Sequence, residues 1–292
     1  MKILDVSKSA IDLKEYVKRS AQESDYKTLI TEDTLIRIDG RPAILYKRFD
    51  ADLEPLRQTL RTIKYDTGAR ALGLVSTSRV FGYQPRIALR RDFCTATTLA
   101  HKTPSKNKQV CDIGKHIVPT YREYFPEVFE SHTKWVGEKI KNEWQISDTP
   151  FTSGIINKNN PLKYHFDAGN IKNVCSCMIA LKRSCGGGFL SLPELGVGLE
   201  IADKSLTIFD GQSILHGVTP IKKLADNTER YTVVYYTLHQ MWKCETITEE
   251  LARIRRVKMD RERKRAGLPT EAELQVTQHG VEEREIISDE HD

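Results

Sequence analysis

The sequence predicts an α+β protein, in which helices flank a compact all-β unit with the architecture of a sandwich or a jelly-roll barrel. The pattern of apolar and polar residues changes at about residue 151. From there to residue 240, short apolar or alternating runs follow one another, separated by Gly, Pro, Asp and Asn, without a helical pattern among them. Helical spacing occurs before and after this region. With 292 residues, 39% of them hydrophobic, the chain is long enough for one sizeable core.

Residues 1–150 are expected to form an N-terminal helical and basic scaffold that packs on the β unit. A helix-rich opening is followed by the stretch LIRIDGRPAILYKRF, in which Asp39 and Gly40 divide two alternating runs, as is typical of a β-hairpin. Apolar residues at helical intervals then predict one helix over residues 51–63 and another from Thr120 to Asn142.

Residues 151–245 make up the predicted β core, and residues 246–292 form a charged helical tail that we expect to be partly disordered. The tail has eight basic residues between Arg253 and Arg265, and its helical pattern stops near Gly267. Two interpretations of the tail remain open. It is either a solvated helix with a frayed end or an arm that contacts phosphate groups.

The net charge of +5 is distributed unevenly along the chain. Residues 246–292 have 9 basic and 12 acidic residues, and residues 1–245 have 36 and 28, which leaves a net charge of +8 on the body. A basic body suits a polyanionic partner, although ordinary soluble proteins also carry such a charge.

We expect an intracellular protein, located in the cytoplasm or in the nucleoid or nucleus, without a membrane segment. No apolar run approaches the roughly 20 residues that a membrane span needs. The first twenty residues are interrupted by charges, unlike a signal peptide. The six cysteines include no CxxC pair, which argues against a structural zinc site and favours reduced thiols, with Cys175 and Cys177 in the core.

A candidate metal site is indicated by His165 and Asp167 in the stretch YHFDAGN, together with His216 in SILHGVTPI. Alternate residues of a strand point to one face, so the first two side chains lie side by side. Two histidines and one carboxylate form the facial triad of non-haem Fe(II) oxygenases, which leaves coordination positions open. The alternatives are two hydrogen-bonded core histidines, or a catalytic zinc site made of the same ligands.

A candidate residue for binding a dicarboxylate co-substrate follows in the same β unit. Arg230 opens the strand RYTVVYYTL, and Thr232 lies on the same face of that strand. An oxygenase with this triad binds 2-oxoglutarate, and arginine suits its distal carboxylate because a guanidinium group binds carboxylates bidentately. A zinc site would leave these two residues unexplained.

The sequence resembles the TET/JBP family of 2-oxoglutarate- and Fe(II)-dependent nucleobase dioxygenases, particularly its small phage and microbial members. The resemblance rests on YHFDAGN, CGGGFLSLPELGVGL, FDGQSILHGVTPI and ERYTVVYYTLH, and it covers residues 151–240. It is looser over TSRVFGYQPRIALRRDFC. It implies a double-stranded β-helix, or jelly-roll, core.

The resemblance also implies roles for single residues. His165, Asp167 and His216 are expected to ligate Fe(II), and Arg230 with Thr232 to hold 2-oxoglutarate. Expected contacts with a flipped base come from three further residues: Asn170, Tyr236, and His239, which lies one position away from the family histidine. Asn170 is alternatively a turn residue beside Gly169, and Tyr236 alternatively a core aromatic.

A basic segment upstream of the β unit suits the backbone and bases of a nucleic acid. It interleaves aromatic residues with four arginines, Arg79, Arg86, Arg90 and Arg91. By the resemblance, Arg79 alternatively contacts 2-oxoglutarate. A basic loop packed on the barrel is the other interpretation of this segment.

The expected activity is hydroxylation of the C5-methyl group of a pyrimidine in DNA, with O2 as oxidant and the target nucleotide flipped out of the duplex. Thymine and 5-methylcytosine both remain open. Two other functions remain as well: an oxygenase of the same chemistry that acts on a protein side chain or small molecule, and a non-catalytic nucleic-acid-binding module.

Overall fold

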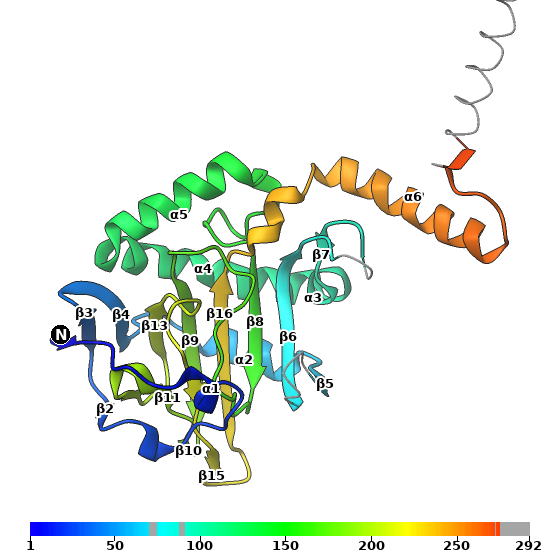
Figure 1. The fold of residues 1–292 in the computed structure, drawn as a ribbon. Coiled ribbons are helices and arrows are strands. Elements are labelled where there is room, and N and C mark those ends of the chain that lie inside the picture. Colours follow the sequence, from blue (N-terminus) through cyan, green and yellow to red (C-terminus); the bar gives the residue numbers. More distant parts are fainter. Residues whose placement is uncertain (70–74, 88–90, 272, 275–292) are drawn as a thin grey trace, which may run out of the picture.

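A ten-stranded, mixed sheet forms the centre of the protein (Figure 1). The computed structural model describes residues 1–292 except 70–74, 88–90, 272 and 275–292. In spatial order the strands are β1 (Lys2–Val6), β3 (Thr34–Ile38), β4 (Arg41–Arg48), β13 (Ser205–Phe209), β9 (Ser176–Arg183), β16 (Glu229–Tyr236), β8 (Ser153–Lys158), β6 (Val75–Gln84) and β5 (Asp66–Ala69), with β7 (Thr95–Ala96) beside β6. Only the β1–β3 pair of this sheet is parallel among the described strands.

Two smaller sheets and six helices complete the described part of the chain. The four-stranded sheet has the order β14 (Gly217–Val218), β11 (Leu190–Leu192), β12 (Val197–Leu199) and β2 (Thr28–Ile30), and β10 (Cys185–Gly187) pairs with β15 (Ile221–Lys223). The helices are α1 (Leu13–Tyr16), α2 (Glu54–Thr62), α3 (Thr98–Lys102), α4 (Pro104–Tyr124), α5 (Pro126–Lys139) and α6 (Ile247–Arg265). Short 3-10 turns cover Glu23–Asp25, Asn142–Trp144, Pro193–Leu195 and His239–Lys243.

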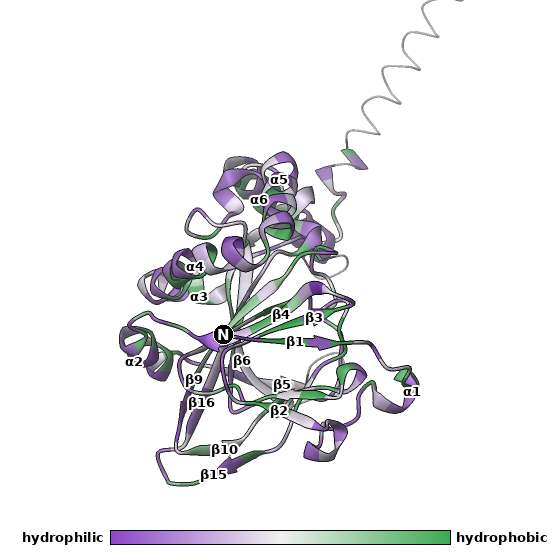
Figure 2. Ribbon diagram, turned by 90° about the vertical axis from the view of Figure 1, so that its left-hand side faces the viewer, coloured by the Kyte–Doolittle hydropathy of each residue, from purple (hydrophilic) through white to green (hydrophobic). Residues whose placement is uncertain are grey.

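The two faces of the large sheet have different roles. Helices α2, α3 and α4 lie on one side of it, and α1 and β2 lie on the other (Figure 2). On strand β16, Tyr231, Val233 and Tyr235 are buried in the cluster that the sheet forms with these helices. The alternate residues of the same strand therefore point to the opposite side, where the four-stranded sheet lies.

Several elements confirm what the sequence predicts. The β3–β4 hairpin turns at Asp39 and Gly40, which both have positive φ, as a tight two-residue hairpin requires. Helix α2 buries Leu56 and Leu60 on one face. Cys175 and Cys177 are buried in the core.

Three expectations for residues 1–150 differ from the structure. The opening contains strand β1 and a single helical turn, α1, because long-range pairing with β3 overrides the local pattern. The helix predicted from Thr120 to Asn142 is two helices, α4 and α5, separated at Phe125, since the residue before Pro126 is disfavoured in a helical conformation. Strands of this segment also join the large sheet, so it is more than a helical scaffold.

The expectation that all thiols are reduced is wrong for Cys94 and Cys244, which form a disulfide. They lie 150 residues apart, so no local spacing could indicate the pair. Cys111, Cys175, Cys177 and Cys185 are free. None of the described helices combines the length and apolar character needed to cross a bilayer.

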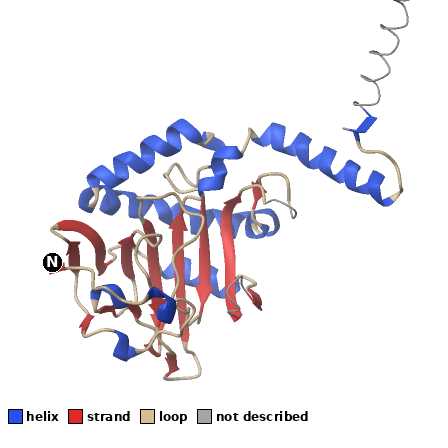
Figure 3. Ribbon diagram, in the orientation of Figure 1, coloured by secondary structure: helices blue, strands red, loops and turns tan. Residues whose placement is uncertain are grey.

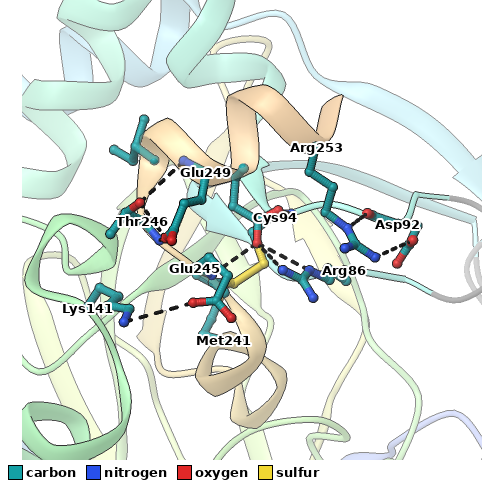
Figure 4. A network of polar contacts seen from close by, with 12 residues as sticks. Arg86, Asp92, Cys94, Lys141, Met241, Glu245, Thr246, Glu249 and Arg253 are labelled. Carbon is teal, nitrogen blue, oxygen red and sulfur yellow. Dashed lines mark hydrogen bonds and ion pairs between the residues drawn. A yellow bond between two sulfur atoms is a disulfide. The ribbon is translucent and has the colours of Figure 1, made fainter. Parts of the chain in front are cut away.

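Helix α6 projects from the body just after this disulfide, at the top right of Figure 3. The carboxylate of Glu250 on this helix is 2% exposed and accepts hydrogen bonds from the guanidinium group of Arg86 and from the backbone N–H groups of Cys94 and Glu245. Arg253 pairs with Asp92 (Figure 4). The first turns of α6 are thus fixed to Arg86, Asp92 and Cys94.

Replacing Glu250 by alanine is expected to lower the free energy of unfolding by about 2–4 kcal/mol, because Arg86 and two buried N–H groups lose their acceptor. Urea unfolding measures the change. The control is Glu262→Ala on the exposed part of the same helix, with an expected change within about 0.5 kcal/mol. Equal effects of both substitutions would contradict the structural role of Glu250.

Candidate metal centre

His165 and His216 are brought together by a short backbone bridge outside the regular strands. The N–H of each residue donates to the carbonyl oxygen of the other, at 3.0 Å from His165 and 3.2 Å from His216. This antiparallel pairing places the two imidazole rings with their centroids 4.4 Å apart. Two distant segments therefore meet at one point.

The backbone also orients each ring. Nδ1 of His165 lies 2.7 Å from the carbonyl oxygen of Lys163, and Nδ1 of His216 lies 2.9 Å from that of Ile214. A carbonyl only accepts hydrogen bonds, so each Nδ1 carries the proton. In the neutral form of each imidazole, Nε2 therefore carries the lone pair through which the ring binds a metal.

Asp167 completes a three-residue cluster. Its Oδ1 lies 3.7 Å from Nε2 of His165 and 3.8 Å from Nε2 of His216. One ligand atom from each of the three residues lies within 4.8 Å of the others, so the group is able to hold one metal ion. Two imidazole nitrogens and one carboxylate oxygen suit Fe(II) and leave other coordination positions open. The structure thus brings together the three residues that the sequence singles out.

Gly211 makes room for the carboxylate of Asp167. Its carbonyl oxygen accepts a hydrogen bond of 2.8 Å from the N–H of Asp167. A Cβ at this position would overlap with Oδ2 of Asp167 and lie 2.9 Å from its Cγ. The absence of a side chain at Gly211 is therefore a requirement for the position of the carboxylate.

A cavity of about 230 Å³ extends from the three-residue cluster. It lies between the two main sheets, because strands β8, β9 and β16 line it together with Leu190 of β11 and Val218 of β14. Four alternating residues of β16 form part of its wall: Arg230, Thr232, Val234 and Tyr236. Arg230 and Thr232 therefore face the cavity that also holds the metal cluster.

Arg230 is a buried cation without a carboxylate partner among the described residues. It is 1% exposed; Nη2 donates to the carbonyl oxygen of Gly188 at 2.9 Å, and Nε has no partner. Burial lowers the pKa of Arg230 to about 10, so the side chain still carries its charge at neutral pH. Burying such a charge is costly unless an anion compensates it.

The surroundings of Arg230 suit a carboxylate ligand. Lys182 lies opposite Arg230 on β9 and adds a second positive charge; burial lowers the pKa of Lys182, and the charge of Arg230 lowers it further. A Cβ at Gly188 would lie 2.8 Å from Nε of Arg230, so this glycine keeps space beside the guanidinium group. The donor set of the three-residue cluster fits Fe(II). The Nε of Arg230, which has no partner among the described residues, fits a carboxylate of a dicarboxylate co-substrate.

Two of the three predicted base-contacting residues line the cavity, and the third does not. Asn170 faces it with its amide 3.1 Å from the hydroxyl of Ser176, and Tyr236 is on the wall. His239 is exposed and its ring packs beside Trp135, outside the cavity. Leu238, the last extended residue before the 3-10 turn His239–Lys243, lines the cavity wall instead.

The predicted basic surface is largely engaged within the protein. Arg79 donates to the carbonyl oxygen of Lys64 and pairs with Asp66, and it does not line the cavity; Arg86 binds Glu250. Arg91 donates to Gln84 and Pro85 and lines a hollow that shares Tyr236 and Leu238 with the cavity. Arg90 is outside the described residues. Contacts of these arginines with a nucleic acid stay a prediction.

Sequence reasoning missed Asn157 and Asn160, which are both buried in the cavity wall. Asn160 hydrogen-bonds the backbone of Thr77 through both its amide oxygen and its amide nitrogen, and its nitrogen also donates to Asn157. Asn157 in turn donates to the hydroxyl of Thr232 at 3.4 Å. A polar residue two positions after Ile155 in the apolar run SGIIN was the available signal.

Gly211→Ala is expected to weaken binding of Fe(II) at least tenfold, because the added methyl group displaces the carboxylate of Asp167. Anaerobic titration of the purified variant with Fe(II) measures the affinity. The matched control is Gly137→Ala, at a helical position with open space, which should bind Fe(II) as the wild type does. Unchanged affinity in Gly211→Ala would show that Asp167 is not a ligand.

Solved structures with a similar fold have low sequence identity. The structure titled "NgTET1 in complex with 5mC DNA" matches with a TM-score of 0.56 and 13% identity, over 80% of this chain and 88% of that one. A 2OG-Fe(II) oxygenase family protein from Burkholderia pseudomallei matches with a TM-score of 0.45 and 13% identity, over 68% of this chain and 86% of that one. The first likeness supports the fold alone.

No curated protein matches the sequence. Residues 83–239, more than half of the chain, match the model of the Tet_JBP family, the oxygenase domain of the 2OGFeDO superfamily. This range contains the three-residue cluster, Arg230 and Thr232. The protein therefore belongs to the TET/JBP family, and it is an oxygenase that depends on 2-oxoglutarate and Fe(II).

Proposed function

We propose that this enzyme hydroxylates the C5-methyl group of a pyrimidine, thymine or 5-methylcytosine, in DNA. The observation that carries the proposal is the shared cavity. A metal-binding cluster, a buried guanidinium group without a carboxylate partner among the described residues and the amide of Asn170 face one space of about 230 Å³. These are the groups needed for the metal, the co-substrate and the edge of a base.

In this proposal His165, Asp167 and His216 hold Fe(II), and Arg230 with Thr232 holds the distal carboxylate of 2-oxoglutarate. The iron and its co-substrate supply the oxidising chemistry: O2 oxidises the methyl group to an alcohol, while 2-oxoglutarate loses CO2 and becomes succinate. The protein positions the groups that bind the metal and the co-substrate. Asn157 holds the hydroxyl of Thr232 in place, and the N–H of Asp167 is fixed by Gly211.

The rest of the cavity suits a pyrimidine. Apolar side chains, among them Phe209 and Leu238, keep water away from the reacting centre. Tyr236 offers an aromatic surface for the base, and the amide of Asn170 can donate or accept a hydrogen bond at its edge. Because an amide serves either base in this way, the proposal includes both thymine and 5-methylcytosine.

Duplex DNA is the proposed polymer. A methyl group inside a stacked duplex cannot reach a cavity between two sheets, so the nucleotide must be flipped out. The net charge of +8 on residues 1–245 supports a polyanionic partner. The similar fold of NgTET1, whose structure is titled as a complex with 5mC DNA, supports the same substrate class.

The proposal extends to architecture and location. The cavity between the ten-stranded and four-stranded sheets supports a double-stranded β-helix, or jelly-roll, at residues 151–245 as the oxygenase core. Residues 246–292 follow this core in the chain as a separate charged segment of the sequence. An enzyme that acts on DNA works in the cytoplasm or in the nucleoid or nucleus.

The decisive experiment supplies Fe(II), 2-oxoglutarate and air with two duplexes of one sequence, with and without 5-methylcytosine. Nucleoside mass spectrometry then identifies the product. We expect 5-hydroxymethylcytosine from the methylated duplex or 5-hydroxymethyluracil from either one. Succinate formation that is stimulated by a peptide or metabolite but by neither duplex would overturn the proposed substrate.

Asp167→Ala is expected to reduce product to the uncatalysed background, because two imidazoles alone do not complete the metal site. The same mass spectrometry measures it. Asp226→Ala, in an exposed turn away from the cavity, is the matched control and should retain full turnover. Retained turnover in Asp167→Ala would remove this residue from the ligand set.

Binding of 2-oxoglutarate to Arg230 is expected to stabilise the fold by about 2.7 kcal/mol at a hundredfold excess over its dissociation constant, because the ligand binds the folded protein and not the unfolded chain. Thermal unfolding with and without the co-substrate measures this. Arg230→Gln should lose the shift and still bind Fe(II), whereas Arg183→Gln, an exposed substitution on the neighbouring strand, should keep it. An unchanged shift in Arg230→Gln would place the dicarboxylate elsewhere.

A further inference from the structure

We propose that helix α6 is a fixed basic arm that contacts the phosphate backbone of duplex DNA beside the cavity. This inference rests on the proposed function and adds a second contact region to it. Helix α6 extends away from the body after Cys244 (Figure 1). Between Arg253 and Arg265 it has eight basic and two acidic residues. The sequence alone slightly favours a solvated helix, and three features of the structure support the arm instead.

The first reason is that α6 is fixed at its base. The Cys94–Cys244 disulfide lies immediately before the helix, and Arg253 pairs with Asp92 one turn beyond Glu250 (Figure 4). Glu250 is buried and binds both Arg86 and the backbone of Cys94. A frayed, solvated helix needs none of these contacts. A fixed helix presents its charges without paying the entropy of ordering them on binding.

The second reason is the place where the arm is attached. Arg86 and Asp92, which bind α6, flank Ile87 and Arg91 in the chain. Ile87 and Arg91 line the hollow that shares Tyr236 and Leu238 with the metal-containing cavity. The attachment of α6 therefore lies next to the wall of the cavity, where DNA on either side of a flipped nucleotide would pass.

The third reason is the availability of the charges. Arg255, Lys258 and Arg265 recur three and seven residues apart, so they lie along one side of the helix. These three and Arg256 are exposed, and the described residues include no acidic partner within ion-pair distance of them. By contrast, the arginines nearer the cavity, Arg79 and Arg86, are paired with Asp66 and Glu250. These four cations of α6 are therefore not engaged in ion pairs within the described part of the protein.

The apolar residues of α6 favour a nucleic acid over a lipid surface. A helix that lies in a membrane interface presents a broad apolar face to the lipid. In α6, Ile247, Leu251 and Ile254 line a small hollow against Tyr83 and Trp144 of the body. Ile247 and Leu251 keep 36% and 51% of their surface exposed, so the body covers this apolar side only in part, but the apolar side is confined to the first turns and the outer turns are mainly charged. A polyphosphate backbone is the partner that matches this charge.

The test compares the full-length protein with the variant Arg255→Gln/Arg256→Gln/Lys258→Gln/Arg265→Gln. Binding to a methylated 30-base-pair duplex is measured from 50 to 200 mM salt. Each lost phosphate contact should reduce the slope of log K against log salt by about 0.9. We expect the slope to fall by about 2 to 4, and the affinity at 50 mM salt to fall at least tenfold. The thermal shift given by 2-oxoglutarate should not change, which shows that the variant is folded.

The control variant removes the same charge from exposed positions on the body: Lys27→Gln/Arg41→Gln/Lys204→Gln/Lys223→Gln. Its salt slope should change by less than 1. Equal salt slopes for the α6 variant and the wild type would overturn the proposal that α6 contacts DNA. So would binding to phosphatidylserine vesicles that depends on the four α6 residues while the DNA slope stays the same.

Failure of the arm is distinguishable from failure of the proposed function. If the wild type oxidises the duplex and the α6 variant binds it with an unchanged salt slope, only the arm is wrong. If the wild type neither binds nor oxidises either duplex, the proposed substrate is wrong and the arm falls with it.

Discussion

The backbone bridge between His165 and His216 is the interaction on which the candidate site depends. It brings together two segments that belong to no regular strand, and it turns both imidazoles toward Asp167. The same two segments provide the carbonyl oxygens that fix the ring tautomers. A metal site usually needs carboxylates or other groups around its ligands to orient them. Here the main chain does this for both histidines, so the geometry follows from the fold.

Strand β16 separates two environments with opposite demands. Tyr231, Val233 and Tyr235 supply apolar burial against the helices, and the residues between them form the cavity wall. An unpaired buried guanidinium group on that wall is unfavourable for folding. The strand tolerates it because its other face is fully packed, and because strands β8 and β9 hold it on both sides. Because side chains alternate between the two faces of a strand, β16 packs against the helices with one face and supplies residues of the site with the other.

The residues of the candidate site could be predicted from the sequence more fully than the structure around them. The three-residue cluster, Arg230 and Thr232 are polar residues at strand spacing among apolar runs, and each faces the cavity as predicted. His239 lies outside the cavity because it begins the 3-10 turn His239–Lys243 and its ring packs beside Trp135, whereas Leu238, one position earlier, lines the cavity. Arg86 could not be interpreted from the sequence, since its partner Glu250 is 164 residues away. The parallel pairing of β1, the break at Phe125 and the disulfide likewise depend on contacts that local patterns do not contain.

The Cys94–Cys244 bond has a topological consequence. It closes the chain into a ring that contains every residue of the metal cluster, with residues 1–93 and 245–292 as two tails. A protease that cuts the exposed turn at residues 224–228 would open the ring, yet both pieces would remain one covalent molecule. Only a second event, the reduction of the sulfur bridge, would let the nicked halves separate.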